Sequence, residues 1–408
     1  MTLREWNARL HGLVVFRALL EDQVVAKLVD LTDRMAAGAS GMGLVCDAAA
    51  AFEAALFEHT PNWSDYLSNA VLESETICVR QAAAGQLSPV LQSALDSELA
   101  FLQALCGLTL DKLFQTAYSE QSQRPELAFL PRWETRELDL AAAYTQRMSE
   151  VGKKGYGMFA KHHVFTVENG QLVPVKYPDP QKLSELPGYE QEREKVIANT
   201  RALLTGMPAN NVLLYGDRGT GKSSTIHAIL NAYKEQGLRM IEIPKSAVEE
   251  LSLIREYLAD SPMKFIIYID DLSFDSQDNA FTELKAALEG GLSACQPNTL
   301  IYATSNRRHL IKENFSDRED DVNKNDTRQE QLSLSDRFGL TITFINPDKK
   351  DYLDIVEKIA ADRGLQVDAQ RLDAAAEQWA VRRGGRSPRC ARQFIDHVES
   401  ALRRGKEW

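Results

Sequence analysis

The strongest structural signal in the sequence is the octapeptide Gly216-Asp217-Arg218-Gly219-Thr220-Gly221-Lys222-Ser223. It matches the pattern G-x-x-x-x-G-K-[ST], in which glycines let the backbone turn tightly and bring its N–H groups around phosphate oxygens. An apolar run, Val212–Tyr215, precedes the octapeptide, and a helix-forming segment follows it as far as Gln236. Strand, loop and helix in this order predict a phosphate-binding loop, with the positive end of the helix facing the same anion.

The end of this loop carries two side chains with separate tasks. Lys222 is expected to reach the β and γ phosphates of a nucleotide, and the Ser223 hydroxyl is expected to bind Mg²⁺. The predicted nucleotide-binding set comprises Gly216, Asp217, Arg218, Gly219, Thr220, Gly221, Lys222, Ser223 and Ser224.

Four more apolar runs follow and alternate with helical segments. They are Arg239–Ile243, Phe265–Ile269, Thr299–Thr304 and Thr341–Phe344. Continuous apolar strands separated by helices predict a parallel sheet that is covered on both faces. The sequence therefore predicts an α/β core at residues 181–346 and a small helical lid at residues 347–408.

Polar side chains stand at the ends of two of these runs. Asp270 and Asp271 come directly after Phe265–Ile269, on a strand expected beside the loop. Asp270 is assigned to Mg²⁺, directly or through water, and Asp271 to orienting or deprotonating the attacking water. Asn306 follows the next run, and its amide is assigned to the γ-phosphate or to the same water.

Later arginines complete the predicted site. Arg337 is placed to stabilise charge on the transferred phosphoryl group, as an arginine finger does, and its alternative is a surface salt bridge with Asp336. In the lid, Arg389 and Arg392 are both candidates for reaching back to the phosphates.

The first 150 residues differ in composition from the rest. They hold 11 Lys and Arg against 20 Asp and Glu, with apolar residues three or four apart, which predicts helices. This region has no catalytic motif and is predicted to be a helical domain, partner-binding or regulatory, over residues 1–150. Residues 151–180 place Asn169-Gly170 between two β-rich runs, which predicts a β-hairpin linker.

The composition of the whole chain limits its partners. The 408 residues carry a formal net charge of −11, which does not favour general binding to nucleic acid. No segment is long and apolar enough to span a bilayer, so a membrane is not an expected partner. The five cysteines are scattered and none forms a Cys-x-x-Cys pair, which is typical of a reducing compartment. The predicted location is cytoplasmic.

In their order along the chain, these elements resemble the AAA+ ATPases. More narrowly, Leu186–Phe344 resembles a bacterial AAA+ family catalogued only as a domain of unknown function. The residues that carry the resemblance are Pro208–Ser224, Tyr268–Phe274, Tyr302–Leu310 and Leu332–Leu340.

The resemblance gives each motif a family role. It makes residues 216–223 Walker A and Asp270-Asp271 Walker B. Asn306 becomes sensor 1, Arg337 the finger, and Arg389 the preferred sensor 2. It also implies that Tyr189 contacts the adenine base.

The resemblance further implies ATP and Mg²⁺ as cofactors. It favours an oligomeric ATPase that remodels or regulates a protein client docked on residues 1–150, with Arg337 acting on the neighbouring subunit's nucleotide. One alternative is a helicase-loader or initiator-like protein associated with nucleic acid. Asp270-Asp271 favours this alternative, because many AAA+ enzymes have Asp-Glu at these positions and Asp-Asp resembles the loaders and initiators. The other is an ATP-binding switch with little turnover, because Asp271 is one methylene shorter than glutamate.

Overall fold

A computed structural model describes residues 1–37, 42–83, 87–117, 129–272, 279–289, 297–306 and 337–408. Within these ranges the chain forms two compact units. The first is Met1–Lys161 with Asp260–Pro262, and the second is His162–Ala259 with Met263–Trp408. The domain boundaries expected from composition, at residues 150, 180 and 346, stay predictions.

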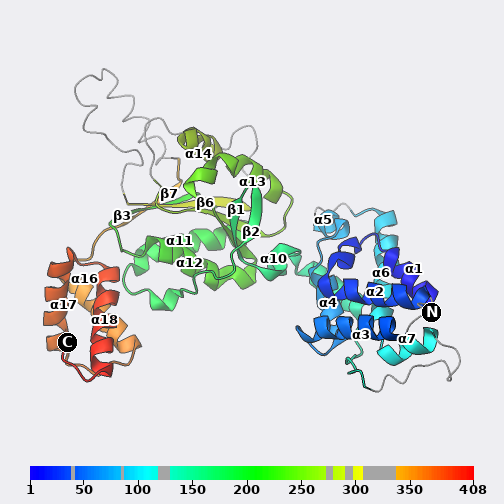
Figure 1. Cartoon of the computed structure of the whole chain (residues 1–408). Helices are drawn as coiled ribbons and strands as arrows, with labels where there is room; N and C mark the ends of the chain where they lie inside the picture. Colours follow the sequence, from blue (N-terminus) through cyan, green and yellow to red (C-terminus); the bar gives the residue numbers. More distant parts are fainter. Residues whose placement is uncertain (38–41, 84–86, 118–128, 273–278, 290–296, 307–336) are drawn as a thin grey trace. The chain divides into compact units, whose positions relative to one another are not determined.

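In its described residues, the first unit is built mainly of helices (Figure 1), with an isolated β-bridge between Asn62 and Glu134. Its helices are α1 (Leu3–His11), α2 (Gln23–Ala36), α3 (Met42–Phe57), α4 (Trp63–Glu73), α5 (Ile77–Ala83), α6 (Pro89–Cys106), α7 (Leu110–Ala117), α8 (Leu140–Ser149), α9 (Val151–Lys154) and α10 (Met158–Lys161). Phe52 lies at the centre of an aromatic cluster, with its ring centroid 5.2 Å from Trp63 and 4.9 Å from Trp133. All three side chains are buried, so they anchor the core.

The second unit is built on a seven-stranded sheet. Its strands are β1 (Val164–Glu168), β2 (Gln171–Pro174), β3 (Val212–Gly216), β4 (Leu238–Glu242), β5 (Lys264–Ile269), β6 (Thr299–Ser305) and β7 (Leu340–Phe344). The strand order is β2-β1-β4-β5-β6-β3-β7, and every neighbouring pair except β1 and β2 is parallel. The five strands expected from the apolar runs are confirmed as a parallel set.

The hairpin forms where the Asn-Gly pair predicts it. Asn169 and Gly170 both have positive φ, at 52° and 76°, as a tight two-residue turn requires. Strand β1 also pairs in parallel with β4, through Phe165 and Ile241 among others. The hairpin therefore extends the edge of the sheet, an attachment that the sequence did not indicate.

Helices cover both faces of the sheet. Figure 1 shows α11 (Glu190–Leu204) and α12 (Lys222–Tyr233) on one face, and α13 (Leu251–Leu258) and α14 (Asn279–Glu289) on the other. Between the sheet and α11 and α12 lies an apolar core that includes Leu214, Ile266 and Tyr302, all fully buried. Burying each such side chain contributes about 1.5–3 kcal/mol.

The chain ends in a small helical lid. It consists of α16 (Lys349–Asp362), α17 (Ala369–Arg383) and α18 (Pro388–Arg403), packed around a core of their own that includes Tyr352 and Phe394. Helix α18 begins with Ser387 as its N-cap and Pro388 in its first turn, an arrangement that favours helix initiation. The fold class predicted from the sequence is confirmed: a P-loop α/β core, a C-terminal helical lid and an N-terminal helical unit. In the described part of the chain, no helix has the length and apolarity needed to cross a membrane.

Candidate nucleotide-binding site

The phosphate-binding loop connects β3 to α12. At Gly216 the chain passes so close to β7 that a Cβ would lie 2.0 Å from the Phe344 carbonyl oxygen, so only glycine fits. The next residue donates its backbone N–H to the same oxygen at 2.8 Å. Gly221, with φ of 90°, is the N-cap of α12. These two glycines let the loop leave the sheet edge and enter the helix without strain.

Lys222 is buried at the start of α12. Its Nζ donates to the carbonyl oxygens of Gly216 at 2.9 Å and Asp217 at 2.7 Å, and to Asn306 Oδ1 at 3.2 Å. Burial lowers the pKa of Lys222, against the attraction of Asp217, Asp271 and Asp270. The loop thus holds an ammonium group in position for an anion.

Asp270 accepts three hydroxyl hydrogen bonds on one carboxylate oxygen. The donors to Oδ1 are Thr304 Oγ1 at 2.5 Å, Tyr268 OH at 2.6 Å and Ser223 Oγ at 2.8 Å. Burial acts to raise the pKa of Asp270, but the hydrogen bonds from Thr304, Tyr268 and Ser223 outweigh it, and the net shift is downward. The carboxylate is therefore held ionised beside the Ser223 hydroxyl.

Asp271 has an unusual backbone conformation for a residue other than glycine. Its φ is 49°, and its N–H donates to Thr304 Oγ1 at 2.9 Å. Its carboxylate Oδ1 accepts a hydrogen bond from Asn306 Nδ2 at 2.6 Å. Strained backbone of this kind persists where neighbouring structure enforces it and is common at functional sites.

The strand order explains how these groups meet. Strand β6 lies between β3 and β5, so Asn306 at its end stands between the loop and the aspartate pair. The sequence predicts a strand beside the loop for Asp270 but does not give the strand order, in which β6 is inserted between β3 and β5. The carboxyl ends of all three strands still meet at one edge of the sheet.

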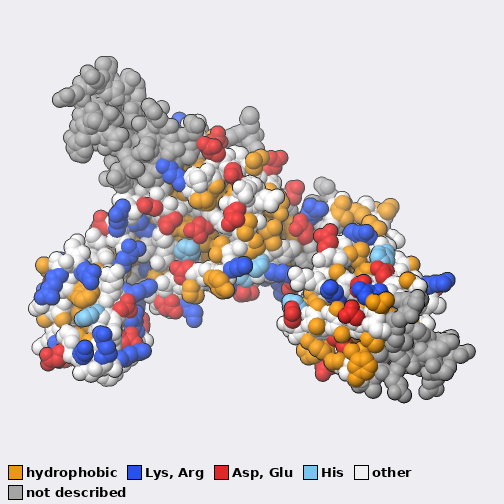
Figure 2. Space-filling model, viewed as in Figure 1, with side chains coloured by type: hydrophobic (Ala, Val, Ile, Leu, Met, Phe, Trp, Pro, Cys, Tyr) orange, Lys and Arg blue, Asp and Glu red, His pale blue; other side chains and the backbone are white. Residues whose placement is uncertain are grey.

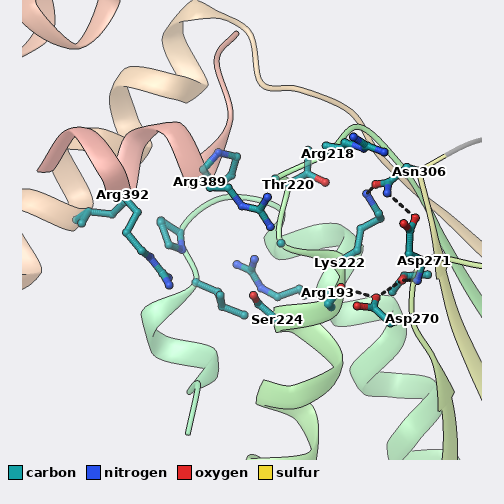
Figure 3. Close-up of a pocket in the computed structure, with 18 residues that line it drawn as sticks. Arg193, Arg218, Thr220, Lys222, Ser224, Asp270, Asp271, Asn306, Arg389 and Arg392 are labelled. Atoms are coloured by element: carbon teal, nitrogen blue, oxygen red, sulfur yellow. Dashed lines mark hydrogen bonds between the residues drawn. The ribbon is translucent and has the colours of Figure 1, made fainter. Parts of the chain in front are cut away.

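A pocket of about 420 Å³ opens above this edge (Figure 3). Its lining residues are Leu186, Pro187, Arg193, Arg218, Gly219, Thr220, Gly221, Lys222, Ser223, Ser224, Asp270, Asp271, Thr304, Asn306, Ile359, Pro388, Arg389 and Arg392. The structure thus brings together most of the loop, the aspartate pair, Asn306 and the lid arginines.

Both candidate lid arginines line the pocket. The backbone N–H of Arg389 donates to the loop carbonyl of Gly219 at 3.1 Å. Arg392 instead donates from its guanidinium to Gln181 Oε1 at 3.2 Å and to the Glu185 carbonyl at 3.4 Å. Arg392 therefore fastens the lid to the segment before α11, whereas Arg389 contacts the phosphate-binding loop itself.

Four predicted residues do not line the pocket: Gly216, Asp217, Tyr189 and Arg337. The first two shape the base of the loop. Tyr189 donates its hydroxyl to the Ile345 carbonyl at 2.6 Å, and its ring stacks on Phe344 at 5.2 Å. The structure therefore does not bring Tyr189 to the pocket, because its ring and hydroxyl pack against the end of β7. Asp336, the alternative partner of Arg337, lies outside the described residues.

The pocket also contains residues that sequence reasoning missed. Leu186, Pro187 and Ile359 supply apolar wall, and Arg193 supplies a buried cation from α11. The sequence holds one signal for Arg193: it stands three, four and seven residues before Val196, Ile197 and Thr200, which form the buried side of the helix. A basic residue in an apolar stripe is unexpected unless it has a partner.

The sheet order, the loop at the end of β3 and the helical lid define the class of this protein by fold, as a P-loop α/β protein with a C-terminal helical lid. The family model described as "Protein of unknown function (DUF815)" matches residues 159–402, and the chain belongs to that family. The resemblance drawn from the sequence, to a family catalogued as a domain of unknown function, is thereby confirmed.

Among solved structures, the chain is similar to the Thermotoga maritima RuvB Holliday junction branch migration motor. The identity is 21% with a TM-score of 0.39, over 55% of this chain and 65% of the RuvB chain. A mutant of the same protein matches with 19% identity and a TM-score of 0.40, over 56% and 67%. This chain thus spans about 65% of the RuvB chain in the first of these matches. No curated protein matches the chain.

Proposed function

We propose that this protein binds Mg-ATP in the pocket and hydrolyses it. One observation carries the proposal: Lys222, Ser223, Asp270, Asp271 and Asn306 come from three separate elements, and hydrogen bonds join them into one set, in which Thr304 links Asp271 to Asp270. The set contains a cation for phosphate, two oxygen donors for a metal ion, and a carboxylate–amide pair for water. Phosphoryl transfer requires these parts and little covalent chemistry from the protein.

The donor set fits Mg²⁺. The Ser223 hydroxyl and the Asp270 carboxylate lie 2.8 Å apart, and hard oxygen ligands of this kind suit that ion. When bound, Mg²⁺ neutralises charge on the β and γ phosphates. Ser223 and Asp270 would hold it, and Lys222 would exchange its loop carbonyls for phosphate oxygens.

The water-activating part is Asp271 with Asn306. The 2.6 Å hydrogen bond from the Asn306 amide fixes the Asp271 carboxylate at the pocket edge. In the proposed reaction, Asp271 orients the attacking water and accepts its proton, while Asn306 senses the γ-phosphate.

We extend the proposal to an oligomer that remodels or regulates a protein client. Arg337 is a described residue that does not line the pocket, which agrees with its proposed action on the nucleotide of a neighbouring subunit. The helical unit has no catalytic motif and is the proposed docking site for the client. A cytoplasmic location is part of the same proposal.

A switch with little turnover is the second candidate function. It is favoured by Asp271, whose short carboxylate is already engaged by Asn306. The nucleic-acid alternative has less support, because Figure 2 shows basic and acidic side chains interspersed over the described residues of the face it presents.

The test is phosphate release from ATP, with Mg²⁺ and with excess EDTA. We expect release to require Mg²⁺ and to fall by at least about hundredfold in Asp270→Asn, since that variant loses the metal's carboxylate ligand. Asp354→Asn, at an exposed lid position, is the matched control and should match the wild type. Undiminished release in EDTA, or an Asp270→Asn variant as active as the wild type, would overturn the proposal.

A further inference from the structure

Arg193 is a buried cation beside the phosphate-binding loop. The residue is 7% exposed, on the first turns of α11, and its side chain lines the pocket. Its helix neighbours Val196, Ile197 and Thr200 are buried against the sheet. Arg193 is thus the member of the buried stripe that faces the pocket (Figure 3).

The protein groups around Arg193 compensate little of its positive charge. Among the described residues, the structure gives its guanidinium one ionic contact, from Nη2 to Glu190 Oε1 at 3.6 Å. The Glu190 side chain is 64% exposed, and the same oxygen lies 3.4 Å from Lys358 Nζ. Burial lowers the pKa of Arg193 even though Glu190 and Glu192 act to raise it. A guanidinium has five N–H donors, and burying it with so few acceptors is expensive unless a ligand supplies more.

The position of Arg193 indicates which part of a nucleotide it meets. In the view of Figure 3, Lys222 lies between Asn306 and Arg193. The Asn306 side is the end for the γ-phosphate and the water, because Asn306 bonds to Lys222 and Asp271 there. In the same view, Ser224, one residue after the proposed metal ligand, lies on the Arg193 side of Lys222 and also lines the pocket.

We propose that Arg193 binds the α-phosphate of the nucleotide. The inference rests on the proposed function. It adds a nucleotide contact made by the core helix α11 to the nucleotide contacts proposed for the loop and the lid. It follows that Arg193 acts equally on ADP and ATP, because both carry an α-phosphate. It also follows that the contact is indifferent to the base.

The test is equilibrium titration of the full-length protein with ADP, ATP and GDP, for wild type, Arg193→Gln and Arg193→Lys. Arg201→Gln is the matched control, since Arg201 lies on the same helix and its Nε bonds to Tyr233 OH outside the pocket. We expect Arg193→Gln to raise the Kd for ADP and for ATP by about ten- to hundredfold, as for a lost charge-assisted hydrogen bond. Arg193→Lys should lose less, and Arg201→Gln should bind as the wild type does.

Thermal unfolding separates a ligand contact from a structural one. Without nucleotide, Arg193→Gln should melt at the same temperature as the wild type or higher, because it removes a poorly paired buried charge. With saturating ADP, its stabilisation should be smaller than that of the wild type.

Several results would overturn the inference. The first is an unchanged Kd in Arg193→Gln. The second is a loss of affinity confined to ATP, which would place Arg193 at the γ-phosphate. The third is an altered ratio of ADP to GDP affinity, which would place Arg193 at the base. A lower melting temperature without nucleotide, combined with wild-type affinity, would make Arg193 structural. A wild type that binds no nucleotide would instead refute the proposed function, and this is seen before any variant is measured.

Discussion

The two units of this chain bury charged side chains in different surroundings: the α/β unit buries cations beside a pocket, and the helical unit buries a carboxylate within its core. In the α/β unit, Lys222 and Arg193 are 6% and 7% exposed, and both line the pocket. In the helical unit, Glu53 is 2% exposed, and neither carboxylate oxygen has a hydrogen-bond partner among the described residues. Burial raises the pKa of Glu53 to about 7, against the attraction of Arg132.

This difference teaches how a buried charge should be interpreted. Beside a pocket that can take an anion, a buried cation has a proposed ligand, and its burial is explained by binding. Glu53 lies on α3 within a helical core, where no such ligand is evident, so its burial acts on stability. The helical unit should therefore respond to pH, and the α/β unit to nucleotide.

The largest expected effect comes from removing Arg337, the proposed arginine finger of the α/β site. Arg337→Ala should reduce ATP turnover by about a thousandfold, because an arginine finger stabilises charge that develops only in the transition state. Affinity for ATP should stay within about threefold. Turnover per subunit of the wild type should also rise with protein concentration, measured across a dilution series.

Arg382→Ala, at an exposed position of the lid, is the control for this series. Turnover that is independent of concentration and unaffected by Arg337→Ala would refute a site shared between subunits.

Asp271 distinguishes an enzyme from a switch. Asp271→Asn should lower turnover by about a hundredfold and leave ATP binding intact, since it removes the proposed base. Asparagine tolerates the positive φ of 49° at this position, so the fold should be kept. Single-turnover hydrolysis provides the measurement. A wild type with rates no higher than those of Asp271→Asn would favour the switch.

Glu53 tests the helical unit. A carboxyl group whose pKa is raised from 4.5 to about 7 holds its proton more tightly in the folded state. The free energy of unfolding should therefore fall as pH rises from about 4.5 to 7, and stay low above that range. Glu53→Gln should be more stable than the wild type by about 2 kcal/mol at pH 8 and nearly equal at pH 4. Urea unfolding at both pH values measures the difference, and an equal effect at both would contradict this account.

Tyr189 gives the smallest expected change. Tyr189→Phe removes the hydrogen bond to the Ile345 carbonyl and should cost about 1 kcal/mol of stability. Tyr189→Leu, which also removes the stacked ring, should leave ADP affinity within about twofold. A tenfold loss of affinity in Tyr189→Leu without a change in fold would instead support the base contact implied by the family resemblance.

Local signals in the sequence predicted the loop, the strands and the strand-end residues, because each depends on neighbouring residues. The insertion of β6 between β3 and β5 depends on pairing between distant segments, which no short pattern encodes. Tyr189 was assigned to the base, but its place is set by Phe344 and Ile345, more than 150 residues later. The sequence does not predict a role for Arg193, because a single arginine in an apolar stripe indicates a ligand contact only when the pocket beside it is known.

The most direct test of the central claim is ATP binding in the presence of Mg²⁺, compared between wild type and Lys222→Ala. Lys195→Ala, an exposed lysine on α11, is the control. The proposed site predicts that the wild type and Lys195→Ala bind ATP with equal affinity, and that Lys222→Ala loses at least about hundredfold, because Lys222 is the buried cation of the loop. Equal affinity in all three proteins, or no binding by the wild type, would contradict it.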